Sequence, residues 1–219
     1  MMKSDEMVPR ARNFFRPDDY FNLNVRNGVN RTPTGTRIVT LPGEFVVGLH
    51  RGLEDETGGA APIILYEVGK WWGAQFMEKH AAEVRRFYDT EPGSLPVGFF
   101  LQVLKKVWAI YGWGALDMSF EHRDKGFVLA GVDSPLYSDV VGNIGRTADH
   151  LVAGIIASVV GALAGRELEC TEIACKSRGD QRCLFLVGMQ NRMDVVGNWV
   201  KQNRAANEIL EAIGRGDLA

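Results

Sequence analysis

Apolar residues recur three and four positions apart along much of this chain, which is the spacing of one face of an α-helix. The clearest run carries Ile64, Leu65, Val68, Trp72 and Phe76. Four other stretches show the same spacing, so the pattern predicts helices over residues 44–53, 61–80, 99–111, 147–164 and 193–213. Gly69 and Gly73 interrupt the second helix at a cost of about 1 kcal/mol each relative to alanine, which indicates close packing against another element.

Two other regions alternate apolar and polar residues, as strands of a half-buried sheet do. Residues 116–120 and 127–132 flank a turn at 123–126, and residues 167–174 and 182–188 flank a turn at 178–181. Each pair predicts an antiparallel hairpin. Together the patterns predict an α+β single domain, with helices packed on a small antiparallel sheet of hairpins.

The chain divides by pattern into three parts. Residues 1–42 have no sustained period and are predicted to be an N-terminal extension, held on the domain by the aromatic pairs Phe14-Phe15 and Tyr20-Phe21. Residues 43–190 are the predicted domain. Residues 191–219 are predicted to form an amphipathic helix that packs on it.

Charge and composition exclude some functions. The 219 residues carry 25 basic and 27 acidic side chains without a basic run, which argues against nucleic-acid binding. The longest apolar stretch, residues 151–164, is shorter than the roughly 20 residues that cross a bilayer, so no integral membrane segment is predicted. The polar first ten residues resemble no secretion signal, and we expect a cytoplasmic protein with reduced thiols.

The apolar stretch 151–164 also carries the small residues Gly154, Ser158 and Gly161. They would let another element approach closely. That element could lie in the core of the same chain or across a dimer interface, with core packing favoured.

The three cysteines of the chain, Cys170, Cys175 and Cys183, lie within fourteen residues. Thiolates and a carboxylate gathered around one turn suit a closed site for zinc. Inert buried thiols and a disulfide or redox pair are the alternatives, and the reducing compartment argues against the disulfide.

Three stretches of the sequence resemble the 4-vinyl reductase domain family, a fold shared with phenol-sensing bacterial regulators and with subunits of the eukaryotic transport-particle tethering complex. They are residues 52–56, the turn Gly112-Trp113-Gly114 with its hairpin to Asp133-Ser134, and residues 154–183. The resemblance covers roughly residues 43–190.

The resemblance implies a structural zinc site. In zinc-containing members a ligand at the start of a buried helix is followed by spaced glycines, Glu-x-x-Cys and a second cysteine eight residues later. The matching ligands here are Asp149, Glu172, Cys175 and Cys183. Many relatives carry cysteine at the first of these positions.

Two residues are kept as substitute ligands. His150 lies beside Asp149, which could instead cap the helix. Glu172 and Cys175 are three positions apart and would point to opposite faces of a regular strand, so the site needs a bulge or strand end near Ala174. Without a bulge Cys170 would replace one of them. With a bulge Cys170 is a packed thiol.

The function implied by the resemblance is binding of a hydrophobic or aromatic molecule, phenolic or tetrapyrrole-like, by a sensor, carrier or assembly factor. The aromatic-rich turn from Trp108 to Trp113 offers these two side chains as pocket lining, and core packing is the alternative for both. The alternatives are a 4-vinyl reductase or accessory protein of (bacterio)chlorophyll synthesis, and a homodimeric interaction scaffold. The chain shows no catalytic triad, phosphate cradle or nucleotide fingerprint, so a non-enzymatic role is favoured. A sensor of this kind would need a separate protein partner.

Overall fold

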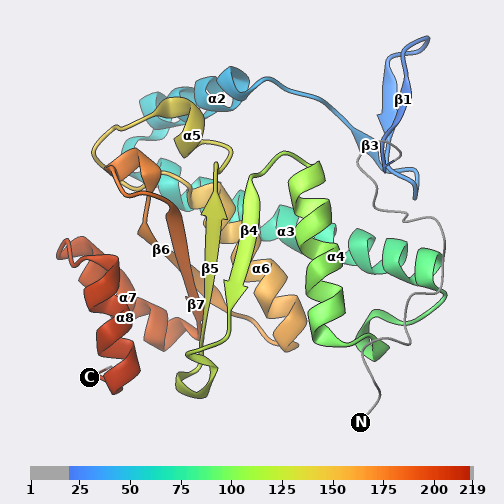
Figure 1. The fold of residues 1–219 in the computed structure, drawn as a ribbon. Coiled ribbons are helices and arrows are strands. Elements are labelled where there is room, and N and C mark those ends of the chain that lie inside the picture. The colour runs from blue at the N-terminus through green and yellow to red at the C-terminus, as the bar shows by residue number, and fades with distance from the viewer. Residues whose placement is uncertain (1–19, 218–219) are drawn as a thin grey trace.

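The computed structural model describes residues 20–217. Its centre is a four-stranded antiparallel sheet in the order β4-β5-β7-β6 (Figure 1). The strands are β4 (Ala115–Ser119), β5 (Phe127–Asp133), β6 (Glu169–Ala174) and β7 (Cys183–Gly188). They are the two predicted hairpins, joined side by side through β5 and β7. The predicted α+β architecture is confirmed.

Helices cover both faces of this sheet. On one face lie α4 (Val97–Ile110) and α6 (His150–Ala164), with α3 (Ala61–Tyr88) packed on α6. On the other lie α7 (Gln190–Lys201) and α8 (Ala206–Arg215). Side chains alternate between the two cores, since Phe185 joins the first and Leu186 the second. Both faces are apolar because both are covered.

The helices α3 and α6 cross with their backbones almost touching. A β-carbon added to Gly154 would lie 2.0 Å from the Tyr66 carbonyl oxygen, and one added to Gly69 would lie 2.1 Å from the Leu151 oxygen. The Ser158 hydroxyl donates a 2.6 Å hydrogen bond to the Lys70 carbonyl. The small residues of α6 therefore serve packing within the chain, as favoured from the sequence, since Gly154 and Ser158 contact α3 and Gly161 lies against Arg166 just beyond the helix.

The amino-terminal part of the described chain forms a second sheet that the sequence pattern did not reveal. It consists of β1 (Asn22–Asn24), β2 (Val29–Arg31) and β3 (Arg37–Ile38), paired in that order. These strands are too short to show a period. Tyr20 is buried, as expected for an aromatic anchor, while Phe14-Phe15 lie outside the described residues.

Two of the predicted helices differ in extent from the sequence expectation. The helix α3 continues to Tyr88, because the polar side chains beyond His80 hide its period while Val84 remains buried. The predicted helix 193–213 is two helices, since Asn203 adopts a left-handed φ of 59° between α7 and α8. The remaining helices are α2 (Gly43–Thr57), close to expectation, and the short α5 (Ser138–Val141).

Candidate metal centre and ligand cavities

Four side chains meet in one buried cluster at the end of the central sheet. Asp149 stands at the start of α6, Glu172 on β6, and Cys175 and Cys183 on either side of the turn between β6 and β7. Each offers one ligand atom, and these atoms lie within 4.8 Å of one another. The four residues are those that the resemblance implied as zinc ligands.

A bulge in β6 brings two of these side chains to the same face. The pairing of β6 with β7 shifts between Glu172 and Ala174, since Glu172 lies opposite Phe185 while Ala174 lies opposite the next residue, Leu184. One extra residue reverses the alternation. Glu172 and Cys175 therefore share the face that looks towards α6, and the irregularity near Ala174 that the site requires is present.

Hydrogen bonds hold the cluster from several sides. The Ser138 amide donates to Asp149 Oδ1 at 3.2 Å, and the Asp149 amide donates to Glu172 Oε2 at 3.1 Å. The Lys176 amide donates to Cys183 Sγ at 3.3 Å. Glu172 Oε1 is buried and makes no hydrogen bond with the described residues. A buried carboxylate oxygen without a partner is costly unless a cation or proton satisfies it.

The electrostatics of the cluster favour a cation. Burial raises the pKa of Asp149 to about 6 and that of Glu172 well above its usual range. The Cys183 thiol donates a hydrogen bond to Cys175, which lowers the pKa of Cys175 and raises that of Cys183. Without a metal, several of these buried groups would have to stay protonated to avoid burying their negative charges together. Two thiolates and two carboxylates match the ligand types of zinc, and no position would stay open for substrate.

The two substitute ligands lie outside the cluster. Cys170 is buried in the main core, as expected for a packed thiol. His150 follows Asp149 in the first turn of α6 and is partly exposed. Burial lowers the pKa of His150, so its imidazole is neutral at physiological pH.

An aromatic cavity of about 570 Å³ lies between the amino-terminal sheet and the body of the domain. Trp113 lines it, and its ring packs edge to face on Trp72, with ring centres 4.3 Å apart. The other aromatic residues that line it are Tyr20, Phe21, Trp71, Phe76 and Tyr111.

Trp108, the other predicted lining residue, has a different place. Its side chain is fully buried and its indole N–H donates to the Trp113 carbonyl at 3.2 Å. It lines neither the aromatic cavity nor the larger cavity described below. Trp108 thus contacts Trp113 from within the core, through this hydrogen bond and an edge-to-face ring contact.

Two polar residues of the aromatic cavity were not singled out from the sequence, His80 and Glu83. Both lie on α3 and are almost completely buried. Burial lowers the pKa of His80 to about 4 and raises that of Glu83. The available signal was their spacing of three, which continues the buried face of α3.

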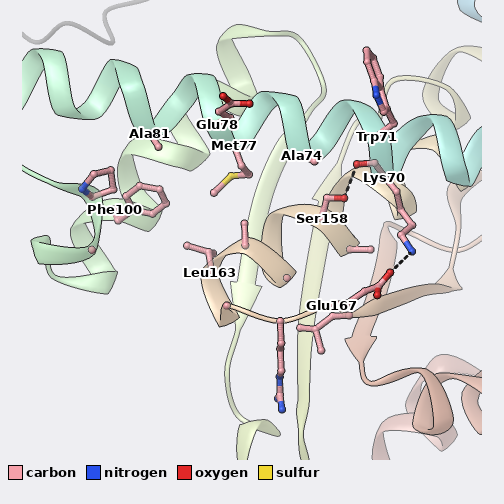
Figure 2. Close-up of a pocket in the computed structure, with 18 of the residues that line it drawn as sticks. Lys70, Trp71, Ala74, Met77, Glu78, Ala81, Phe100, Ser158, Leu163 and Glu167 are labelled. Atoms are coloured by element: carbon pink, nitrogen blue, oxygen red, sulfur yellow. Dashed lines mark hydrogen bonds and ion pairs between the residues drawn. The ribbon is translucent and has the colours of Figure 1, made fainter.

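A larger cavity, of about 1010 Å³, lies between α3, α4 and α6 (Figure 2). Trp71 of α3 lines both cavities. Its walls are mostly apolar and include Met77, Phe100 and Leu163. The charged side chains of Lys70, Glu78 and Glu167 stand at its edge. No residue predicted as a ligand contact lines this cavity.

Comparison with known proteins places the fold. Residues 132–189 match the sequence profile of the 4-vinyl reductase domain family, which confirms the resemblance seen in the sequence. That region runs from the end of β5 through β7 and contains all four cluster residues. Among curated proteins no match was found. No helix among residues 20–217 is long and apolar enough to cross a membrane.

Solved structures resemble the chain at low sequence identity. The phenol-responsive sensory domain of the transcription activator PoxR, with phenol, superposes with a TM-score of 0.63 at 15% identity, covering 78% of this chain and 86% of that domain. Trafficking protein particle complex subunit 3 from Naegleria fowleri, covalently bound to palmitic acid, gives 0.51 at 13% identity, covering 68% and 95%. A vinyl-4-reductase family protein from Methanocaldococcus jannaschii gives 0.46 at 17% identity, covering 68% and 82%.

Proposed function

We propose that this protein is a zinc-stabilised domain that binds an aromatic or hydrophobic small molecule and acts as a sensor, carrier or assembly factor. The observation that carries the proposal is the aromatic cavity. Its volume of about 570 Å³ lies within the range of small-molecule sites, and seven aromatic residues surround a few buried polar groups. Such a lining binds flat apolar rings by stacking and edge contacts.

The similarity to the sensory domain of PoxR supports this reading. That domain shares the fold over most of both chains, and it was solved with phenol. In the present chain Gln75 and Tyr111 line the cavity and offer hydrogen-bonding groups to a ligand hydroxyl.

The zinc part of the proposal rests on the four-residue cluster. The ion would be held by Asp149, Glu172, Cys175 and Cys183. Bound zinc would neutralise the negative charges of these buried groups, which otherwise repel one another. The role is structural, because four protein ligands complete a tetrahedral site. The chain's own residues would then fix the start of α6 to the β6–β7 turn.

Ligand binding is tested by tryptophan fluorescence and thermal shift with 2-naphthol as the probe. We expect 2-naphthol to raise the melting temperature of the wild-type chain, because a ligand that binds the folded state stabilises it. Trp113→Leu should abolish the shift while the chain stays folded. Absence of a shift in the wild type at millimolar probe would refute the proposal.

A tetrapyrrole carrier or vinyl-reductase accessory is the second candidate, and the larger cavity favours it. A volume of about 1010 Å³ suits a ligand bigger than one or two rings. Ala162→Trp, at an exposed position of its lining, should block a tetrapyrrole there without weakening 2-naphthol. Equal loss of both ligands would argue against two separate sites.

Pairing of two copies is a further part of the proposal. Because α3 packs on Gly154 and Ser158 of α6, a dimer would use another surface. The helix α2 is the candidate, since only His50 among its side chains is buried while Phe45 and Leu49 are about half exposed. Native mass spectrometry of the wild type and of Phe45→Glu tests the assignment, which predicts a dimer that the variant dissociates.

A further inference from the structure

Two cations at the aromatic cavity pair with no carboxylate of residues 20–217. Arg37 of β3 and Lys79 of α3 both line it, and both are exposed at its mouth. Neither forms an ion pair with a described residue. On the same helix, Lys70 pairs with Glu169 at 2.7 Å and Arg85 with Glu91 at 2.7 Å, so cations of α3 are paired where an acid is within reach.

The position of Arg37 adds a second sign that an anion is missing. In the register of the amino-terminal sheet Arg37 lies directly opposite Arg31. Like charges directly opposite each other on paired strands are destabilising. The Arg31 guanidinium donates to the Gly35 carbonyl at 2.7 Å, whereas Arg37 lines the cavity.

The one acidic residue of the lining does not compensate these cations. The Glu83 carboxyl accepts hydrogen bonds from the Tyr20 hydroxyl at 2.7 Å and from the Thr34 hydroxyl at 3.1 Å. Burial raises its pKa and these hydrogen bonds lower it, and both carboxyl oxygens are already engaged by the two hydroxyls. His80 is neutral for the reason given above. The cavity is thus aromatic inside and positively charged at its mouth.

Glu83 also holds the chain segment that carries Arg37 against α3. Tyr20 and Thr34 belong to the amino-terminal segment, and both of their hydroxyls bind this one carboxyl of α3. The Arg86 guanidinium adds a hydrogen bond to the Pro33 carbonyl at 3.1 Å. The segment that carries Arg37 is therefore tied to the same helix that carries Lys79, so the two cations line the cavity from two different elements.

We infer that the ligand of this cavity is an aromatic acid, a flat apolar molecule whose carboxylate lies between Arg37 and Lys79. The inference rests on the proposed function, and it specifies the class of ligand. The rings would stack within the Trp113 and Phe76 walls, and the anionic group would remain at the solvated mouth, where its desolvation costs least. Opposite charge would then select acids over neutral compounds of the same shape.

The test compares three probes of one ring system: 2-naphthoate, its uncharged amide 2-naphthamide, and 2-naphthol. Exposed charge pairs contribute about 0.2–1 kcal/mol each, a factor of roughly 1.4 to 5, so two of them should favour naphthoate over naphthamide about 2- to 30-fold. Arg37→Gln and Lys79→Gln should each remove a few-fold of this preference, and the double variant should abolish it. Added salt should weaken only naphthoate.

Lys201→Gln is the matched control, because Lys201 is an exposed lysine of α7 beyond the other face of the sheet. It should leave all three affinities unchanged. Equal binding of naphthoate and naphthamide by the wild type, or a preference that survives the double variant, would overturn the inference. If 2-naphthol still binds in that case, the proposed function stands and only the ligand class is wrong; if no probe binds, both fall.

Discussion

Glu172 and Cys175 lie three positions apart in the chain, yet their side chains enter the same buried cluster because β6 carries an extra residue between Glu172 and Ala174. In a regular strand the two would face opposite cores. The bulge therefore decides whether the hairpin can contribute both a carboxylate and a thiol to one metal ion.

Removing a cluster thiol should release the metal. The wild type made in zinc-supplemented cells should carry about one zinc per chain. Cys175→Ser and Cys183→Ser should each lower zinc content and reduce the melting temperature by about 5–10 °C, which corresponds to roughly 2–3 kcal/mol for a chain of this size. Cys170→Ser is the control, because Cys170 lies in the core outside the cluster. Metal analysis and thermal melts report both quantities, and a wild type without metal refutes the site.

Asp149, and not its neighbour His150, should complete the site. Asp149→Asn keeps the size of the side chain but removes its charge, so we expect zinc affinity to fall at least tenfold. His150→Asn should bind zinc like the wild type, since His150 is not among the four clustered residues. Competition with a chromogenic chelator measures both affinities. The reverse order would assign the fourth ligand to His150.

The α3–α6 contact should tolerate no added methyl group. In Gly154→Ala the new β-carbon would lie 2.0 Å from a backbone oxygen of Tyr66, so the helices must separate. We expect destabilisation of about 1–3 kcal/mol or more in denaturant unfolding. Gly197→Ala is the matched control, because nothing lies within 4 Å of its β-carbon position in α7. There alanine should stabilise the chain by up to about 1 kcal/mol.

The buried histidines should contribute a loss of stability in mild acid. Burial lowers the pKa of His50 and of His80 to about 4, against about 6.5 in the unfolded chain. Between these values the two histidines bind more protons in the unfolded state, so their contribution lowers the free energy of unfolding as pH falls from about 6.5 to about 4. The buried carboxyls of Asp149 and Glu172 act in the opposite direction, because burial raises their pKa. Above this window the two residues contribute no slope.

His80→Phe should flatten that dependence, since phenylalanine retains the stacking on Phe76 and cannot take up a proton. Urea unfolding of wild type and variant at several pH values, with a chelator present in both, gives the comparison. Parallel curves through the window would show that His80 is protonated in the folded chain as easily as in the unfolded one.

The sequence alone determined the elements whose pattern is local. Helical spacing located α2, α3, α4 and α6, alternation located both hairpins, and the family spacing named the four residues that the fold brings together. These signals are readable because a helix or strand that buries one face repeats its apolar residues with a fixed period. The glycines Gly69 and Gly73 indicated close packing for the same reason, since each is costly within a helix.

Only the tertiary structure decided what depends on contacts between distant segments. The amino-terminal sheet is too short to have a period, and it is held by Tyr20 and Thr34 on Glu83, more than forty residues away. Tyr20, Phe21 and residues 36–40 of the amino-terminal segment complete the lining of the aromatic cavity beside α3, so neither His80 nor Glu83 could be assigned to it beforehand. The register shift in β6 likewise results from pairing with β7, because alternation within one strand carries no information about its partner.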